Sequence, residues 1–533
     1  TVYIPADASA RAVGADAVAA AFSADPSVTV VRTGSRGMLW LEPLVEVQTA
    51  AGRRGYANVA ASAVPSILAG TAESVGVLDA DPWLAGQRRV TFARVGVVDP
   101  MSLADYRSRG GMAGLARALT LPSAEVVEEV VASGLRGRGG AGFPTGVKWR
   151  TVLGAASDVK YICANADEGD SGTFADRMLM EGDPFSLIEG MLIAGHAVDA
   201  RTGFIYLRSE YPDARAALQK AIEVAYAEGV LGPDALGPGI GFDLHLRVGA
   251  GAYICGEETG LIESLEGKRG WPRIKPPFPA IEGAFRKPTV VNNVETLCCV
   301  THIIERGAAW FKTIGVPPDP KNPRDAGSYG PKLYNISGHV NTPGTYEIPL
   351  GITVRELIEK YGGGVWKGRK AKGAIPGGIS MGIMTETEFD TPLDFNGPGK
   401  VGCLGLGTGA VTVFDEETSI VDVLYNICRF FAHESCGQCT PCREGTGWMM
   451  KMMDRMRRGQ GRLEDLKILD EVAKSIGIMP GTTICGLADG AAWPIKNAIR
   501  KFRSEFEEYI KRTNPTGYAV VDAVPALQII GSH

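Results

Sequence analysis

The spacing of hydrophobic and polar positions in residues 1–92 predicts a small α/β domain. An alanine-rich stretch near Asp16–Phe22 favours a helix, and Val28–Arg32 favours a strand. Pro43–Gln48 and Gly55–Ala60 lie on either side of a short Ala-Gly-Arg-Arg sequence, an arrangement that predicts a hairpin.

Residues 93–330 change from helical signals to an alternation of helix and strand signals. Pro100–Gly134 predicts several helical pieces, and valines recur at helical spacing within Ser123–Ser133. Tyr161 begins an apolar strand that ends in an acidic turn. Glycine is frequent from Gly134 onward, which is typical of an α/β domain whose loops approach a ligand closely.

The next segment, residues 331–415, has the pattern of a β-grasp, or ubiquitin-like, domain. Lys332–Val340 and Thr345–Pro349 predict two strands, and Thr353–Tyr361 predicts a short amphipathic helix after them. This order of elements suits a small β-grasp domain.

Helical signals dominate residues 416–515, where we expect a helical bundle. The clearest apolar stripe of this segment recurs every three or four residues. This spacing predicts one helix face that carries Ile495, Ile499, Phe502, Phe506 and Ile510. Residues 516–533 are expected to form a tail or a docking arm. The fold class predicted for the whole chain is therefore α/β multidomain.

Composition narrows the range of functions. The 533 residues, 45% hydrophobic and 22% charged, are enough for three or four globular domains. A formal charge of −5 gives no basic excess, which argues against a nucleic-acid partner. The sequence has neither a continuous apolar run of about 18 residues nor the basic-then-apolar order of a secretory signal. We expect a cytoplasmic protein without direct membrane contact.

Four of the ten cysteines have the spacing of cluster ligands. Cys436, Cys439 and Cys442 follow one another at intervals of three residues, and Cys485 lies further along the chain. Three such thiolates could hold one face of a [4Fe-4S] cubane while the fourth closes it. A zinc site is the alternative, although zinc ligands more often come in two separated pairs or include histidine. The remaining cysteines are expected to be small buried hydrophobic residues: 163, 255, 298, 299, 403 and 428.

The segment Gly134–Trp149 contains a formal G-x-G-x-x-G at Gly137, Gly139 and Gly142. A dinucleotide fingerprint of the Rossmann type needs a strand before these glycines, but a helix is predicted there. We interpret the segment instead as a nest of backbone N–H groups for an anion, with Lys148 and two arginines as cationic donors. A flexible linker is the alternative interpretation.

Three further segments carry polar side chains beside turns. An acidic turn follows the strand at Tyr161, and it could hold sugar hydroxyls or a hard cation or simply be solvated. Gly249–Gly260 contains adjacent glutamates, which would repel a phosphate and therefore suit sugar hydroxyls or a nicotinamide. A proline-stiffened loop presents Lys275 and Phe278, and a later strand ends in two asparagines.

These motifs together resemble the flavin-binding subunit of bacterial complex I and its relatives, the diaphorase subunits of NAD-reducing hydrogenases and NAD-dependent formate dehydrogenases. The resemblance spans about residues 90–515 and implies FMN, NAD(H) and a [4Fe-4S] cluster on the four cysteines. It implies FMN contacts from Gly137, Arg138, Gly139, Gly140, Lys148, Asn165, Asp167, Asp170, Tyr253, Gly256, Glu257, Glu258, Asn292 and Asn293. It implies NADH contacts from Phe143, Glu168, Lys275 and Phe278.

The resemblance also implies the chemistry. Hydride would pass between nicotinamide and flavin and single electrons between flavin and cluster, with Glu257 and Glu258 lining the site and no side chain acting as nucleophile or base. Asp170 and Ser171 depart from the family, which commonly has Glu followed by Pro at these positions. A non-enzymatic scaffold with a degenerate pocket is the alternative from another functional class.

Residues 1–92 resemble the thioredoxin-like module that carries a [2Fe-2S] cluster in relatives, but here they contain no cysteine. In this respect the chain is most similar to the β subunit of soluble formate dehydrogenases that use molybdenum or tungsten. The expected partners are a small [2Fe-2S] thioredoxin-like γ-type subunit and a large molybdenum- or tungsten-containing iron–sulfur catalytic subunit. Diaphorase subunits of NAD-reducing hydrogenases and the complex I flavoprotein subunit are the nearest alternatives.

Overall fold

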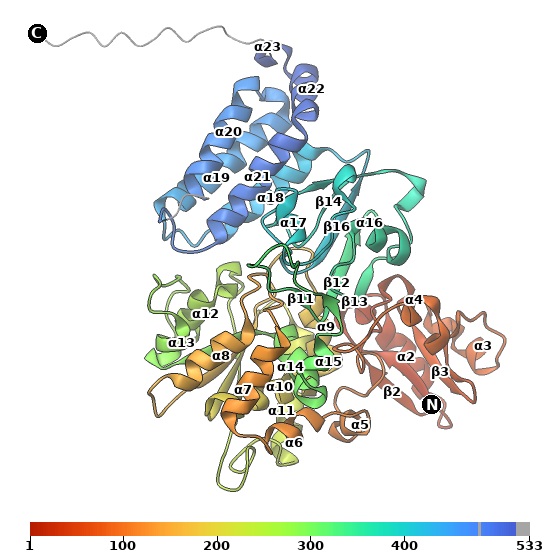
Figure 1. Ribbon diagram of the computed structural model, residues 1–533. Coiled ribbons are helices and arrows are strands. Elements are labelled where there is room, and N and C mark those ends of the chain that lie inside the picture. Colours follow the sequence, from red (N-terminus) through yellow and green to blue (C-terminus); the bar gives the residue numbers. More distant parts are fainter. Residues whose placement is uncertain (478–480, 519–533) are drawn as a thin grey trace, which may run out of the picture. The chain divides into compact units, whose positions relative to one another are not determined.

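The computed structural model describes residues 1–477 and 481–518 and divides the chain into two compact units, Thr1–Glu416 and Glu417–His533 (Figure 1). The first unit contains two five-stranded sheets, one four-stranded sheet and a two-stranded ribbon. The described part of the second unit is helical. None of the helices in the described ranges is long and apolar enough to cross a membrane.

The N-terminal sheet has the order β2-β1-β3-β4-β5, with β1 parallel to β2 and the other neighbours antiparallel. Its strands are β1 (Val2–Pro5), β2 (Val30–Thr33), β3 (Val45–Thr49), β4 (Gly52–Tyr56) and β5 (Gly76–Val77), and its longest helix is α2 (Ala15–Ser23). The predicted helix, strand and hairpin are confirmed. The predicted turn is wrong by several residues: Thr49 pairs with Gly52, so the turn is Ala50-Ala51 and Arg53 belongs to β4.

A four-stranded parallel sheet, in the order β8-β7-β6-β9, organises residues 93–311. Its strands are β6 (Tyr161–Ala166), β7 (Thr202–Leu207), β8 (Asp243–Val248) and β9 (Thr289–Asn293). The helices around it are α5 (Leu103–Ser108), α6 (Ala113–Ala118), α7 (Ser123–Ser133), α8 (Thr145–Gly154), α9 (Ala175–Gly182), α10 (Pro184–Val198), α11 (Pro212–Ala227), α12 (Glu258–Leu265), α13 (Pro279–Glu282), α14 (Val294–Arg306) and α15 (Ala308–Phe311). Helices α10 and α14 are almost wholly buried, as expected where helices cover a parallel sheet.

The adjacent strands β6 and β9 determine where ligands approach this sheet. Asn165 near the end of β6 is in register with Asn293 at the end of β9. Ligands of open parallel sheets bind beyond the carboxyl ends of the strands, so these asparagines mark the functional edge.

A mixed sheet in the order β13-β12-β16-β14-β15 follows. It is formed by β12 (Pro331–Gly338), β13 (Gly344–Pro349), β14 (Ala371–Ile375), β15 (Met384–Thr385) and β16 (Ala410–Asp415), after the ribbon β10 (Gly315–Val316) and β11 (Ser328–Tyr329). Strand β12 is antiparallel to β13 and parallel to β16. The two predicted strands are confirmed, and so is the helix, which begins at α16 (Val354–Glu356) behind a Thr353 cap and continues to Tyr361.

The second unit contains the predicted helices, in the form of α18 (Ile420–Glu434), α19 (Thr440–Arg455), α20 (Leu463–Ile476), α21 (Leu487–Lys501), α22 (Arg503–Thr513) and α23 (Pro515–Tyr518). The prediction of one continuous helix face from Ile495 to Ile510 is wrong. The backbone leaves the helical conformation at Phe502, with φ −117° and ψ 28°, and α22 begins after it. All five apolar side chains of the stripe are nevertheless buried. Of the predicted tail, residues 519–533 lie outside the described residues.

Candidate functional site

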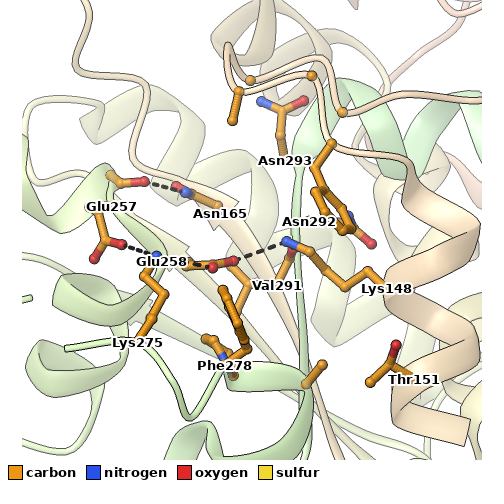
Figure 2. Close-up of a pocket in the computed structure, with 18 of the residues that line it drawn as sticks. Lys148, Thr151, Asn165, Glu257, Glu258, Lys275, Phe278, Val291, Asn292 and Asn293 are labelled. Atoms are coloured by element: carbon orange, nitrogen blue, oxygen red, sulfur yellow. Dashed lines mark hydrogen bonds and ion pairs between the residues drawn. The ribbon is translucent and has the colours of Figure 1, made fainter. Parts of the chain in front are cut away.

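A cavity of about 670 Å³ lies at the carboxyl edge of the parallel sheet. Figure 2 shows its walls: the ends of β6 and β9, one face of α8, the start of α12 and the loop before α13. The glycine-rich loop between α7 and α8 completes it. Segments far apart in sequence therefore meet at the edge where the asparagines end their strands.

The glycine-rich loop folds back on itself above β9. The Gly137 N–H donates to the Phe143 carbonyl at 2.9 Å and closes the loop. Gly140 and Gly142 have φ of +119° and +64°, a region that side chains other than glycine rarely adopt. A Cβ on Gly139 would lie 2.9 Å from the Cβ of Asn293, so only glycine permits this approach. The loop presents backbone to the cavity, as an anion nest requires.

Two lysines and two glutamates form a row along the cavity wall (Figure 2). The Lys148 Nζ lies 2.9 Å from the Glu258 Oε2, and the Lys275 Nζ lies 2.8 Å from Glu257 and 3.4 Å from Glu258. Burial raises the pKa of Glu258, but Lys148 and Lys275 outweigh it, so the pKa is below its ordinary value. Burial lowers the pKa of Lys275, and its glutamate partners raise it overall. Both shifts favour the charged forms of Glu258 and Lys275, and the formal charges of the two lysines and two glutamates cancel.

Glu257 has a second task at the start of α12. Its Oε2 accepts from the backbone N–H groups of Thr259 and Gly260, at 2.8 and 2.9 Å. It is the N-cap of the helix, and its other oxygen holds Lys275. The helix start and the loop that carries Phe278 are thus joined through one carboxylate.

The three cavity asparagines are oriented by hydrogen bonds to the scaffold. Asn292 Oδ1 accepts from the Trp149 indole N–H at 2.7 Å, and within the described residues its Nδ2 makes no hydrogen bond. Asn165 Nδ2 donates to the Gly256 carbonyl at 2.8 Å. Asn293 Nδ2 donates to Asp176 at 2.6 Å, while its Oδ1 caps α14. Asn292 therefore offers a donor to a ligand, whereas the other two shape the wall.

Most of the predicted cofactor contacts meet in this cavity. Its wall includes Gly137, Gly139, Phe143, Lys148, Asn165, Gly256, Glu257, Glu258, Lys275, Phe278, Asn292 and Asn293. Phe143 and Phe278 are 52% and 56% exposed, so they form an apolar rim that a planar ring could cover.

The other predicted contacts do not line the cavity: Arg138, Gly140, Asp167, Glu168, Asp170 and Tyr253. The side chains of three of them have structural partners instead. Arg138 is buried and donates to the Tyr329 carbonyl. Glu168 accepts from the N–H groups of Asp176 and Arg177 at the start of α9. Asp170 accepts from the Ile379 N–H at 2.9 Å and the Ser380 hydroxyl at 2.7 Å, which joins the acidic turn to the following domain.

Sequence reasoning missed several apolar or small residues of the wall, namely Thr151, Pro279, Ala280, Ile281 and Val291. Thr151 lies three residues after Lys148 on α8, so helical periodicity could have placed it on the same face. Val291 contributes its carbonyl, which accepts from Lys148 at 3.0 Å, and no side-chain signal could reveal that contact.

The four predicted cluster ligands belong to two neighbouring segments of the second unit. Cys439 is the N-cap of α19 and Cys442 lies in its first turn. The Ile484 N–H points to the Cys439 Sγ at 3.4 Å, which brings the loop of Cys485 to the same place. Burial and then the nearby Cys436 and Cys439 raise the pKa of the Cys442 thiol.

This arrangement fits a cluster with several metal atoms. An N–H directed at a thiolate sulfur is a typical outer-shell contact of iron–sulfur sites. The other six cysteines are buried, as predicted.

Comparison with known proteins accounts for both sites. Residues 130–302 match the family model of the Nuo51 FMN-binding domain, residues 333–383 an SLBB domain, and residues 422–509 the NADH-ubiquinone oxidoreductase-F iron–sulfur binding region. The chain is 48% identical over 423 residues to an F-type subunit of the NADH-quinone oxidoreductase of Rhizobium meliloti, covering 79% of this chain and 97% of the relative. The chain belongs to the NADH-quinone oxidoreductase F family.

Two further relatives extend the comparison. The F-type subunit of the NADH-quinone oxidoreductase of Escherichia coli is 46% identical over 78% of this chain and 91% of its own length. A chain of an NAD⁺-reducing [NiFe]-hydrogenase, solved in the H₂-reduced state, is 31% identical with a TM-score of 0.67, covering 96% of this chain and 84% of that one. The two quinone oxidoreductase relatives leave about a fifth of this chain uncovered, whereas the hydrogenase chain covers nearly all of it.

Membership of the NADH-quinone oxidoreductase F family confirms the predicted cofactors: FMN, NADH and a [4Fe-4S] cluster. The FMN-binding match contains every residue that lines the cavity, and the iron–sulfur match contains all four predicted cysteine ligands. The glycine nest suits a flavin phosphate, and the asparagine donor suits the polar edge of a ring. The apolar rim suits a stacked ring. The prediction of a complex I-type flavoprotein is therefore confirmed at the level of the family.

Proposed function

We propose that this chain is the NADH- and FMN-binding electron-transfer subunit of a cytoplasmic NAD-dependent formate dehydrogenase that uses molybdenum or tungsten. The observation that carries the electron-transfer function is the cavity in the FMN-binding domain, with its glycine nest beside a charge-neutral row of lysines and glutamates. The formate assignment rests on the fused N-terminal domain, whose 92 residues contain no cysteine.

The residues of this chain bind and orient rather than react. The loop from Gly137 to Gly142 would hold FMN from one side, and Asn292 would donate to it from β9. Phe143 and Phe278 would pack on the dinucleotide beside Lys275 and the two glutamates. Bound there, FMN supplies the exchange between a two-electron hydride and single electrons, which neither nicotinamide nor an iron–sulfur cluster provides. Cys436, Cys439, Cys442 and Cys485 would hold the cluster.

Other predicted contacts are proposed in supporting roles. Gly140 gives the loop its turn, and Arg138, Glu168 and Asp170 fix the segments around the cavity. We propose the same for Asp167 and Tyr253. A Cβ on Gly256, which lines the cavity, would approach the Asp167 carbonyl at 3.2 Å, and Tyr253 begins the 3-10 turn that ends at Gly256.

The strand orders support the proposed domain names. In residues 1–92, a parallel β1–β2 pair continued by the antiparallel β3 and β4 suits a thioredoxin-like fold. In residues 331–415, β12 lies between antiparallel β13 and parallel β16, as a β-grasp sheet requires. We infer that the small [2Fe-2S] γ-type subunit and the large molybdenum or tungsten subunit assemble with this chain.

Anaerobic addition of NADH to the purified protein tests the electron-transfer function. We expect bleaching of the flavin absorbance together with an electron paramagnetic resonance signal from a reduced cluster. Bleaching without reduction of any iron would contradict the proposed path. Purification with native partners, followed by metal analysis and an assay of formate-dependent NAD⁺ reduction, tests the assignment to formate dehydrogenase.

A second candidate is the diaphorase subunit of an NAD-reducing hydrogenase. The solved hydrogenase chain favours it, because a match to 96% of this chain must include most of residues 1–92. Nickel in the purified complex, without molybdenum or tungsten, would decide for this candidate.

A further inference from the structure

A second cavity, of about 400 Å³, lies where the sheet of the N-terminal domain meets residues 86–102, the connector that leads to α5. Four arginines line it, Arg36, Arg53, Arg89 and Arg109, and a single acidic side chain, Asp79, lies on the wall with them. They come from the loop after β2, from β4, from the connector and from the end of α5. Nothing in the proposed electron-transfer function uses this cavity.

Two of the arginines are held in place by a buried carboxylate behind the wall. Arg36 makes two hydrogen bonds to Glu46, at 2.9 and 2.8 Å, and Arg53 lies 3.5 Å from the same carboxylate. Arg53 also donates to the carbonyls of Gly96 and Val97. Asp79 lies 3.3 Å from Arg36, but its side chain is 69% exposed, so water screens its charge. One buried negative charge thus faces two buried guanidinium groups.

The other two arginines make no ion pair with a carboxylate of the described residues. Arg89 donates only to backbone carbonyls, those of Arg36, Phe92 and Val95. Burial first, and then the charge of Arg36, lower its pKa to about 10, against the opposing effect of the Glu347 and Glu46 carboxylates. Arg109 is exposed at the cavity mouth, and its guanidinium makes no hydrogen bond or ion pair with any described residue. The cavity therefore has an excess of positive charge and spare N–H donors.

We propose that this cavity binds the phosphoryl oxyanion of a small molecule, such as free phosphate or pyrophosphate or the diphosphate of a nucleotide. Guanidinium groups match phosphoryl oxygens with paired hydrogen bonds, and convergent arginines are the usual protein site for such groups. Because the wall combines the N-terminal domain with the connector, the bound anion joins these two segments. The site is separate from the FMN and NADH cavity, since the two share no lining residue.

Isothermal titration calorimetry of the full-length holoprotein tests this proposal. NAD⁺ is present at saturation so that the dinucleotide site is occupied. The probes are inorganic phosphate, pyrophosphate and ADP, against potassium chloride at matched ionic strength. We expect saturable binding of pyrophosphate and a higher midpoint temperature of thermal unfolding in its presence. Tighter binding of ADP than of pyrophosphate would identify a nucleotide as the ligand, and equal binding would identify the free anion.

The variant Arg109→Ala changes an exposed side chain and leaves the buried arginines intact. Loss of one charge-assisted contact is expected to weaken pyrophosphate binding by about tenfold. Arg54→Ala is the matched control, because Arg54 is an exposed arginine next to Arg53 on β4, where successive side chains point to opposite faces. Absence of saturable binding to the wild-type protein, or equal weakening by both variants, overturns the proposal.

Discussion

At the residue scale, the row of Lys148, Glu258, Lys275 and Glu257 determines the electrostatics of the flavin cavity. Each lysine lies within 3 Å of a glutamate oxygen, and Glu258 contacts both lysines. The row offers directional donors while its net charge is zero. Removing any one member therefore changes the cavity charge by a full unit in a partly buried place, where charges interact more strongly than in water.

The variant Lys148→Ala should lower the midpoint potential of the flavin. It leaves the row with a net negative charge, which disfavours the extra negative charge of reduced flavin. If the reduced form loses about 1.4 kcal/mol of stabilisation, the potential of a two-electron couple falls by roughly 30 mV. Spectroelectrochemical titration of the loaded protein measures it, with Lys148→Arg as the charge-conserving control. An unchanged potential together with unchanged FMN content would remove Lys148 from the site.

The residue types of the cavity could be predicted from sequence, but the partners of their side chains could not. Glycines, a lysine and paired asparagines carry a local signature of ligand binding, and they do line the wall. The acidic turn carries an equally polar signature, yet Glu168 contacts a helix start and Asp170 contacts a loop more than 200 residues away. A carboxylate that caps a distant backbone looks the same in sequence as one that meets a ligand.

At the scale of elements, Asp170 connects the turn after β6 to the loop that follows β14. Its carboxylate accepts from Ile379 and Ser380, and burial raises its pKa to about 6 despite these hydrogen bonds. Between pH 3.8, the ordinary pKa of the group, and about pH 6, Asp170 therefore keeps its proton in the folded state and loses it in the unfolded state. Ionisation of Asp170 costs folding free energy across this window, so its contribution to stability falls as pH rises.

Asp170→Asn should remove this pH dependence. Between pH 4 and pH 6.5, the stability of wild type relative to the variant should fall by about 1–2 kcal/mol, because only wild type loses a proton there. Thermal midpoints of both proteins at the two pH values provide the measurement. Parallel pH profiles for the two proteins would show that Asp170 does not titrate in this window.

The cluster ligands also belong to the element scale, because the start of α19 and the loop before α21 must meet to form the site. Cys439→Ser should lose most of the bound iron, since it removes the thiolate that receives the Ile484 N–H. Cys428→Ser is the matched control, a buried cysteine inside α18. Iron and sulfide analysis of the purified variants compares them. Equal iron content in both variants would exclude Cys439 as a ligand.

The elements themselves were largely predictable, and the failures have local causes. Strands and helices with strong periodicity, such as β12, β13 and α7, lie where the pattern placed them. The hairpin turn was misplaced because Ala50-Ala51 contains no residue typical of a turn, whereas Gly52, which begins β4, is such a residue. The break at Phe502 was missed because both helices bury the same apolar stripe, so the periodicity continues across a change in backbone direction.

At the scale of the whole molecule, a buried polar junction joins the N-terminal domain to the FMN-binding domain. Arg177 on α9 lies 2.9 Å from Glu181 and 3.7 Å from Asp7, and it donates to the Ser9 hydroxyl at 2.7 Å. The Ala8 N–H completes the junction by donating to Glu181 at 2.9 Å. Sequence reasoning could not find this contact, because its halves lie about 170 residues apart and each looks like an ordinary charged surface.

The variant Arg177→Leu should weaken the union of these two domains strongly. It leaves Asp7 and Glu181 buried without their cation, and breaking a buried pair in this way costs about 3 kcal/mol. Arg11→Ala is the control, because Arg11 contacts Asp213 across the same boundary but is exposed, and such pairs contribute at most about 1 kcal/mol. Chemical denaturation measures the free energy of unfolding of both variants, and limited proteolysis of the connector reports separation of the domains.

The same variant also affects the flavin site. Because α9 also places Asp176 against Asn293, the Arg177 variant should retain less FMN than the control. Equal stability and equal FMN content in the two variants would show that the domains are held together elsewhere.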